Sequence, residues 1–133
     1  MIQFVDPGSL SAADAALLAA ADEAATRAYA PYSNFLVGAA VRARDGRVFA
    51  GCNVENAAYP VGTCAEPVAF SRAVVEGGVR PGDIEAVGIT ASPCGGCRQW
   101  IAEFRVERVL YRRDDGTVAC CSPADLLPDT FSL

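Results

Sequence analysis

Apolar and polar residues alternate along this chain with two periods, one typical of helices and the other of strands. Helical spacing predicts three helices and one short helical turn, at residues 9–28, 64–76, 94–104 and 123–127. In the first helix the leucines share one side and the acidic residues the other, and Ser9 or Ser11 can cap its start. Gly77 and Gly78 end the second helix.

Five runs of apolar and β-branched residues are typical of strands, at residues 36–43, 47–54, 84–91, 106–112 and 117–121. The sequence Arg44-Asp45-Gly46 joins the first two as a hairpin, and Asp114-Asp115-Gly116 lies between the last two. The order of helices and strands predicts an α/β fold with three layers, α-β-α, around a central mixed sheet of five strands. No repeat, linker or low-complexity tract divides the chain, so residues 1–133 are expected to form a single domain.

The composition is that of a globular protein with a substantial core. Hydrophobic residues make up 52% of the chain and charged residues 20%, and the mean hydropathy is +0.23. This is more apolar than a small monomer needs, which suggests that some apolar surface is buried between subunits. No apolar run approaches the ~18 residues that cross a bilayer, and the N-terminus lacks the features of a secretory signal. We therefore expect a soluble, cytoplasmic protein with no membrane partner.

The charge balance excludes some partners and some chemistry. The net charge is −5 and the isoelectric point about 4.6, and the 11 basic residues are scattered arginines. Binding to polymeric nucleic acid relies on a basic surface that neutralises phosphates, so we expect no such partner here. The chain contains no lysine, which excludes a Schiff base on a lysine side chain.

Cysteine and histidine usage narrows the chemistry further. The chain has no histidine, so it cannot contain a Ser–His or Cys–His nucleophile pair, and a zinc site would need thiolates and carboxylates. Without a secretory signal, cysteines are first considered as metal ligands or catalytic groups rather than as disulfides. There are six candidates: Cys52, Cys64, Cys94, Cys97, Cys120 and Cys121.

Two motifs place three of these cysteines at predicted helix starts. One is Cys64-Ala65-Glu66, and the other is Pro93-Cys94-Gly95-Gly96-Cys97. Cys94 and Cys97 are three residues apart in one helical turn, so both sulfurs can face one point, and Cys64 reaches it if the two helices pack side by side. Helix N-termini favour thiolates. Three thiolates leave a fourth position of a tetrahedral zinc site open, which is typical of catalytic zinc, and Glu66 would lie beside it.

Such a site would be suited to hydrolytic deamination. Zinc would activate a water molecule, and Glu66 would act first as general base and then as general acid. Both motifs, with three cysteine ligands, resemble those of zinc-dependent deaminases of nucleobases. Taken alone, however, the Cys94–Cys97 pair also fits a redox dithiol or half of a zinc ribbon. A structural site with four cysteines would need Cys52, Cys120 or Cys121 as its fourth ligand, and these three are otherwise interpreted as buried apolar residues.

The chain also resembles the short, single-domain cytidine deaminase family over nearly its whole length. The resemblance rests on Tyr29-Ala30-Pro31-Tyr32-Ser33-Asn34-Phe35, Val37-Gly38-Ala39-Ala40, Gly51-Cys52-Asn53-Val54-Glu55-Asn56-Ala57, Thr63-Cys64-Ala65-Glu66, Ser92-Pro93-Cys94-Gly95-Gly96-Cys97-Arg98-Gln99 and Leu126-Leu127-Pro128. It implies deamination of cytidine and deoxycytidine in pyrimidine salvage, with one Zn²⁺ per subunit. It also implies a homotetramer whose active sites are built from several subunits.

The resemblance assigns substrate contacts to five residues. Asn53 and Glu55 match positions that hydrogen-bond the ribose 3′-hydroxyl, and Phe35 matches an aromatic that packs on the pyrimidine. Phe131 matches a C-terminal aromatic that reaches a neighbouring subunit's site. Backbone groups of Ala65, and of the residues around Cys94, match contacts to the amide edge of the base. From sequence alone, plainer alternatives stay open: a turn for Asn53, a solvated Glu55, a core Phe35 and a frayed tail for Phe131.

One position departs from the family pattern. Where the family often has an arginine that offsets the charge of the zinc thiolates, this chain has Pro67. We expect the partial positive charge of the helix N-termini to offset the negative charge of the thiolates, or else the side chain of Arg72 or Arg98.

Two rival functions stay open at this point. Deaminases of modified cytosine nucleosides such as blasticidin S share the two motifs, although the Asn53–Asn56 run favours an ordinary ribose. A non-catalytic, zinc-stabilised binding module is a third candidate, and the presence of Glu66 argues against it.

Overall fold

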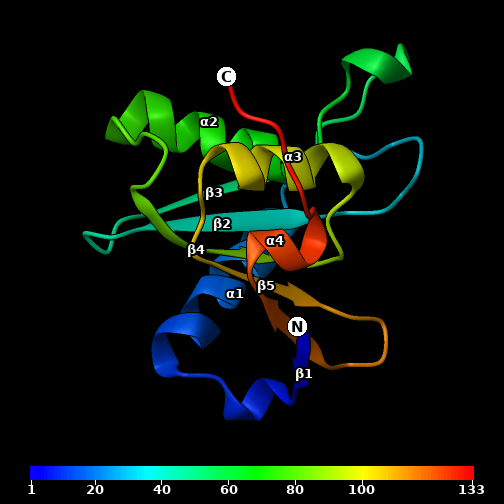
Figure 1. Ribbon diagram of the computed structural model, residues 1–133. Helices are drawn as coiled ribbons and strands as arrows, with labels where there is room; N and C mark the ends of the chain where they lie inside the picture. The colour runs from blue at the N-terminus through cyan, green and yellow to red at the C-terminus, as the bar shows by residue number, and fades with distance from the viewer.

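A mixed sheet runs through the middle of the molecule in the computed structural model, which describes residues 1–133 (Figure 1). Its six strands are β1 (Gln3–Val5), β2 (Gly38–Ala43), β3 (Val48–Cys52), β4 (Ile84–Ile89), β5 (Arg108–Arg112) and β6 (Val118–Cys121). They lie in the order β1-β6-β5-β4-β2-β3. Only the β4–β5 pair is parallel, and the other neighbours are antiparallel.

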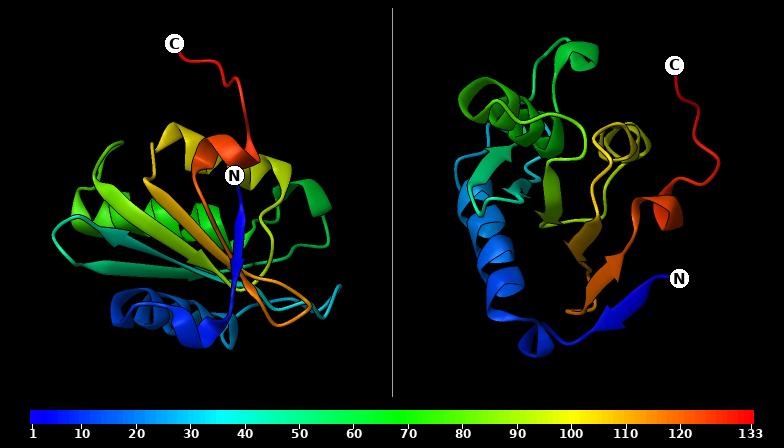
Figure 2. Two further views of the ribbon diagram at one scale, coloured as in Figure 1. Left: turned by 60° about the horizontal axis from the view of Figure 1, so that its bottom comes forward. Right: turned by 60° about the vertical axis from the view of Figure 1, so that its left-hand side comes forward.

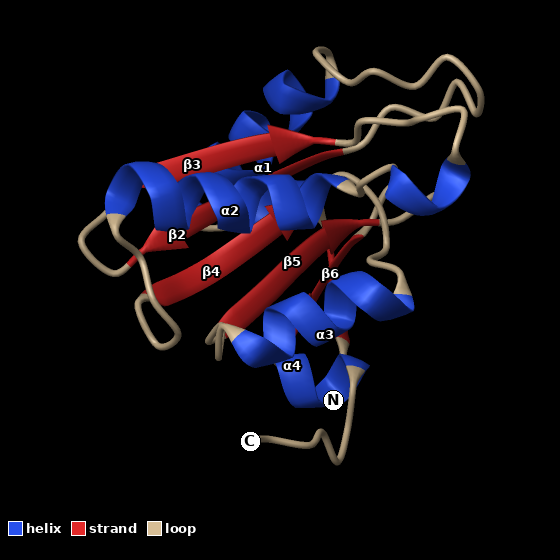
Figure 3. Ribbon diagram, turned by 90° about the horizontal axis from the view of Figure 1, so that it is seen from above, coloured by secondary structure: helices blue, strands red, loops and turns tan.

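Helices cover both faces of this sheet, which confirms the three-layer prediction. The helices are α1 (Ala12–Ala25), α2 (Ala65–Gly77), α3 (Gly95–Glu103) and α4 (Pro123–Leu126), with short 3₁₀ turns at Pro7–Ser9 and Tyr59–Val61. Figure 2 shows α1 alone on one face and the other three helices on the opposite face, and Figure 3 shows α2 and α3 over the strands. The buried side chains form two clusters, one on each side of the sheet. No helix is both long and apolar enough to cross a membrane.

The predicted count of five strands is wrong, because β1 adds a sixth strand at the edge of the sheet. β1 pairs antiparallel with β6, with Phe4 opposite Ala119. It is only three residues long and its side chains are largely exposed, so its sequence carries no readable alternation. The pairing with β6 and the Arg113 guanidinium, 4.2 Å from the centre of the Phe4 ring, hold it in place.

The first helix is also shorter than predicted. Ser11 is its N-cap, with the hydroxyl accepting a hydrogen bond from the Asp14 backbone N–H at 3.2 Å. Ser9 lies instead in the preceding 3₁₀ turn. The helix ends at Ala25, before the Tyr29–Pro31 segment that leads toward the cavity described below.

A buried group of charges ties α1 to the sheet. The carboxylate of Asp14 accepts hydrogen bonds from Arg108 at 2.8 and 2.9 Å and from Arg42 at 3.1 Å. The side chains of Arg42 and Asp14 are 10% and 9% exposed, so this pair is largely removed from water. Hydrogen bonding to Arg108, together with that to Arg42, lowers the pKa of Asp14 below its ordinary value of 3.8.

Asp14→Asn is expected to lower the free energy of unfolding by about 3 kcal/mol at neutral pH, because it leaves the buried Arg42 with only the partly exposed carboxylate of Glu85 as a charge partner. A lowered folded-state pKa means that the native carboxylate adds stability above pH 3.8 and loses that contribution as the pH falls further. Urea unfolding of both proteins should therefore converge below that pH. The control is Asp22→Asn, which breaks the half-exposed pair with Arg112 and should cost less than about 1 kcal/mol. Equal losses at the two positions would contradict the prediction.

Candidate active site

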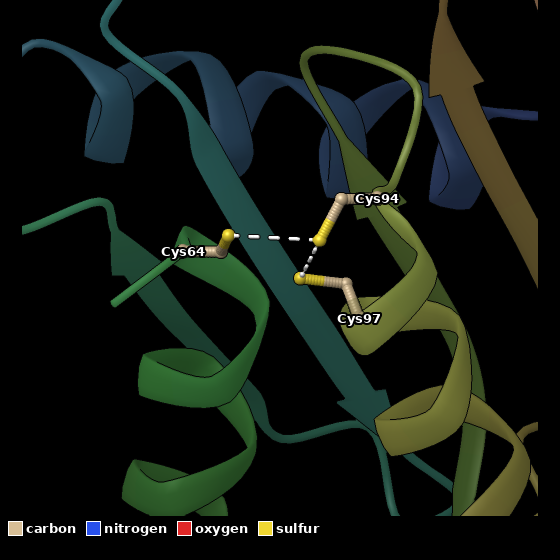
Figure 4. Close-up of side chains that lie close together, drawn as sticks. All are labelled: Cys64, Cys94 and Cys97. Carbon is tan, nitrogen blue, oxygen red and sulfur yellow. Dashed lines mark hydrogen bonds between the residues drawn. The ribbon is translucent and has the colours of Figure 1, made fainter. Parts of the chain in front are cut away.

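Two helices begin side by side at one end of the sheet, and each begins at a cysteine. Cys64 is the N-cap of α2 and Cys94 the N-cap of α3, and both have extended backbone angles. Neither side chain caps its own helix. Both thiols are therefore free to turn toward the gap between the helices, where Cys97 from the first turn of α3 meets them (Figure 4).

The three sulfurs converge with distances that suit one metal ion. Cys64 Sγ lies 3.8 Å from Cys94 Sγ, which lies 3.5 Å from Cys97 Sγ, and all three lie within 4.8 Å of one another. Tetrahedral zinc with Zn–S bonds of about 2.3 Å separates two sulfurs by about 3.8 Å. The donor set and its spacing therefore fit a zinc ion. No fourth cysteine joins this group, which argues against a structural site with four cysteine ligands.

An aromatic stack keeps the two helices together behind the sulfurs. The ring of Phe70 on α2 lies 4.8 Å from that of Phe104 and 6.2 Å from that of Trp100 on α3, with both pairs stacked. Phe70 is fully buried. The relative position of Cys64 and the two α3 cysteines thus depends on this packed apolar contact.

Electrostatics around the sulfurs favour a cation among them. Burial and the neighbouring Glu66 carboxylate raise the pKa of the Cys97 thiol far above its ordinary value, and burial raises that of Cys64. Burial acts in the same direction on Cys94, but the nearby backbone N–H groups of Cys97 and Gly96, together with the Cys97 and Cys64 thiols, outweigh it and lower its pKa. A helix N-terminus therefore stabilises one thiolate, and a divalent cation would stabilise all three.

Glu66 lies in the first turn of α2, two residues after Cys64, and is 2% exposed. Burial raises the pKa of its carboxyl group. The residue borders the main cavity of the molecule, which also reaches Cys64 and Cys94. A carboxylate, two of the three thiols and an open cavity that can take a ligand thus meet at one place.

This cavity has a volume of about 570 Å³, within the range of small-molecule sites. Its wall is mostly apolar and aromatic, and its charged side chains are the carboxylates Glu55 and Glu66. No arginine lines it. Such a cavity favours a neutral or cationic small molecule over an anionic one.

Asn53 and Glu55 both border the cavity, and both hold the segment between α1 and β2. The Asn53 amide accepts a hydrogen bond from the Val37 N–H at 2.8 Å and donates one to the Phe35 carbonyl at 2.9 Å. Glu55 accepts hydrogen bonds from the Tyr32 and Ser33 N–H groups at 2.9 and 3.1 Å and pairs with the Ser33 hydroxyl. Hydrogen bonding to Ser33 lowers the pKa of Glu55. Both side chains therefore have structural partners in this segment: Asn53 does more than form a turn, and Glu55 is tied to the backbone at Tyr32 and Ser33.

The remaining predicted contact residues fall into two groups. Phe35 and Ala65 line the cavity, and Phe35 is 56% exposed, so it is not an ordinary core residue. Phe131 is 71% exposed and does not line this chain's cavity. It lies in the C-terminal segment that leaves α4 and extends from the body of the molecule (Figure 2).

Neither arginine suggested as a charge offset contacts a sulfur. Arg72 donates to Glu76 and to the Ala50 carbonyl, and Arg98 donates to groups outside the thiol cluster. Neither arginine therefore offsets the sulfur charge by a direct hydrogen bond, whereas the backbone N–H groups at the start of α3 contribute to lowering the pKa of Cys94. Pro67 fits its place in the first turn of α2, where a backbone N–H has no helical partner.

Comparisons with known proteins agree with this site. Residues 11–113 match the family described as the cytidine and deoxycytidylate deaminase zinc-binding region. The chain is 44% identical over 124 residues to cytidine deaminase of Sporosarcina psychrophila, covering 87% of this chain and 89% of that protein. It is 42% identical over 116 residues to cytidine deaminase of Mycobacterium tuberculosis, covering 85% of each.

A solved crystal structure with a similar level of sequence identity has the same fold. The crystal structure of cytidine deaminase from Burkholderia pseudomallei is 45% identical and superposes with a TM-score of 0.81, covering 87% of this chain and 97% of that one. This chain therefore belongs to the cytidine and deoxycytidylate deaminase family.

Proposed function

We propose that this protein catalyses the zinc-dependent hydrolytic deamination of cytidine and deoxycytidine to uridine and deoxyuridine, with release of ammonia. The observation that carries the proposal is the meeting of three thiols, at distances suited to tetrahedral zinc, with the buried carboxylate of Glu66 at one cavity. Relatives named cytidine deaminase, 42–44% identical over most of the chain, support the choice of substrate.

Each group at the cavity has a part in the proposed reaction. Cys64, Cys94 and Cys97 hold the zinc ion, which when bound supplies Lewis-acid activation of a water molecule. A carboxylate oxygen of Glu66 accepts a proton from the attacking water and passes it to N3 of the pyrimidine ring. Glu66 then takes the remaining proton from the hydroxyl added at C4 and delivers it to the departing 4-amino group, so that the C4–N bond breaks, C4=O forms, and cytidine and water become uridine and ammonia.

The substrate contacts follow from the shape of the cavity. Phe35 offers an aromatic face to the pyrimidine from the wall of the cavity. Asn53 and Glu55 fix the segment that carries Phe35, and each keeps unused hydrogen-bonding capacity for the ribose 3′-hydroxyl. In this proposal the same two residues shape the wall and bind the sugar.

The direct test combines metal analysis with an assay on the purified protein. We expect one zinc per chain, and ultraviolet loss with cytidine that matches ammonia release. Removal of zinc by a chelator should abolish turnover, and added zinc should restore it. Full activity in protein shown to be free of metal would overturn the proposal, as would zinc-loaded protein that leaves both cytidine and deoxycytidine unchanged.

A second prediction concerns the choice between nucleoside and nucleotide. A 5′-phosphate would enter a cavity whose charged side chains are both carboxylates, and like charges brought together in an enclosed site cost several kcal/mol. We therefore expect kcat/KM for deoxycytidine to exceed that for deoxycytidine 5′-monophosphate by at least about 100-fold. The check is to assay both compounds with the same zinc-loaded preparation. Comparable kcat/KM values would show that the acidic lining does not select the substrate.

We further propose that the protein is a homotetramer in which Phe131 completes the site of a neighbouring subunit. Large apolar side chains are exposed near the cavity and in the tail: Tyr29 by 56%, Tyr59 by 73%, Val61 by 66% and Phe131 by 71%. Exposed apolar groups gathered in this way are typical of interfaces. Analytical ultracentrifugation tests the assembly, and Phe131→Ala should raise KM for cytidine while the mass stays tetrameric. A monomer with full activity would exclude both statements.

A further inference from the structure

One arginine connects the turn before Cys94 to α4, the short helix that packs beside α3. The Arg98 Nε donates a hydrogen bond to the Pro93 carbonyl at 2.9 Å, and its NH1 donates to the Leu126 carbonyl at 3.1 Å. Its NH2 lies 3.5 Å from the Ser92 hydroxyl. Leu126 is the last residue of α4, so one guanidinium joins the metal-binding turn to the helix from which the C-terminal segment begins.

Arg98 also holds the peptide groups on both sides of Cys94. Its side chain binds the carbonyl of Pro93, which belongs to the peptide bond entering Cys94. Its backbone N–H donates to the carbonyl of Cys94 at 3.0 Å. The direction of the Cys94 Cα–Cβ bond follows from those two peptide planes, so one residue helps to set the place from which this sulfur reaches the cluster.

Apart from the buried Pro93, little of this turn is supported by packing. A methyl group added at Gly95 or at Gly96 would meet no atom within 4 Å, so neither residue packs against a neighbouring element. Cys94 itself is exposed, unlike Cys97. Pro93 is buried, and its carbonyl is one of the few points where the turn can be held.

The arrangement acts through geometry rather than through charge at the sulfurs. No guanidinium nitrogen of Arg98 is hydrogen-bonded to a cysteine sulfur: two of its contacts are to Ser92 and Pro93 in the turn, and the third is to Leu126 of α4. A guanidinium has several donors at fixed angles and can span acceptors on different elements. A lysine ammonium is a single point that cannot reach all of them at once.

We propose that Arg98 is a positioning residue for the metal site, which sets the place of Cys94 by fastening the Ser92–Pro93 turn to the end of α4. The inference rests on the proposed zinc site, but it concerns metal affinity and coordination geometry rather than turnover. It also gives α4 a function: the helix is the fixed support against which the turn is held.

The test compares Arg98→Gln and Arg98→Lys with the wild type, with Arg72→Gln as a matched control. Arg72 likewise donates to a main-chain carbonyl, Ala50, from a helix that carries a ligand cysteine, but it does not touch the turns that hold Cys64 and Cys94. Zinc dissociation constants come from competition with a chromophoric chelator. Absorption spectra of the cobalt-substituted proteins report the thiolate coordination geometry, and thermal unfolding of the metal-free proteins reports stability.

We expect both Arg98 variants to weaken zinc binding by about 10–100-fold, as loss of a group that orients a ligand typically does. Their cobalt bands should shift or weaken, whereas Arg72→Gln should change affinity by less than about threefold. If Arg98→Gln does not fold, Arg98→Lys decides, because it keeps the charge and most of the aliphatic stem.

Wild-type affinity and spectrum in Arg98→Lys would show that only the charge matters and would overturn the inference. So would an Arg98→Gln variant that binds zinc as tightly as the wild type. A failure of the proposed function would look different: zinc would bind normally to the wild type, and cytidine would not react. The Arg98 comparison would still be decisive in that case, because its readouts need no turnover.

Discussion

Replacing Glu66 with glutamine is expected to lower kcat for cytidine by roughly 10²–10⁴-fold, the usual contribution of a general acid–base group. Glutamine keeps the size and shape of the side chain, which is 2% exposed, so packing at the start of α2 should not change. It cannot accept the proton of the attacking water. Because the amide does not alter the three thiols, the variant should keep one zinc per chain, measured by atomic absorption, and a KM close to that of the wild type.

The matched control is Glu76→Gln, near the other end of the same helix. Glu76 pairs with Arg72 at the surface, and its side chain is 48% exposed, so its loss should leave kcat within about twofold and stability within about 1 kcal/mol. A Glu66→Gln protein that binds zinc and still turns over cytidine at the wild-type rate would remove Glu66 from the mechanism. A variant that loses zinc as well would show that the carboxylate helps to build the site.

The local signals in the sequence were sufficient for most of the elements and for the metal site. Glycines end α2 and form hairpin turns. Cys94 and Cys97 are three positions apart in the sequence, which is the spacing of neighbours on one side of a helix. Each of these features depends only on residues a few positions away in the sequence. The convergence of Cys64 with that pair needed one further assumption, that α2 and α3 pack side by side, and the Phe70–Phe104 stack satisfies it.

The features that sequence reasoning missed depend on contacts between distant segments. β1 is held by pairing with β6, more than a hundred residues later. Glu55 binds backbone N–H groups about 22 residues earlier, and Arg98 reaches a carbonyl 28 residues later. Neither hydrophobic periodicity nor a sequence motif indicates a hydrogen bond from a side chain to a main-chain atom far away in the sequence. For Asn53 and Glu55, the signal that could have been used is a pair of polar residues after a strand, facing a Pro-Tyr-Ser-Asn loop.

Gly51→Ala is expected to weaken zinc binding, although Gly51 lies on β3, under α2, and does not contact the thiols. A methyl group at Gly51, on β3, would lie 2.5 Å from the Ala69 nitrogen and 2.9 Å from the Ala65 carbonyl oxygen. Both are main-chain atoms, so the helix itself must move away from the sheet. Because Ala65 follows Cys64 directly, that movement carries one sulfur away from the other two. We expect at least a tenfold loss in zinc affinity, and overpacking should lower the free energy of unfolding by about 1–3 kcal/mol.

The matched control is Gly77→Ala, at the other end of the same helix. Its added methyl would meet the Phe49 ring at 2.4 Å, so it should also cost stability, but a side chain can yield and the strain lies three helical turns from Cys64. Urea unfolding of the metal-free proteins and chelator competition separate the two effects. If both variants lose stability and only Gly51→Ala loses zinc affinity, the spacing of α2 and β3 sets the position of Cys64. A folded Gly51→Ala protein with wild-type affinity would mean that the start of α2 adjusts independently of the rest of the helix.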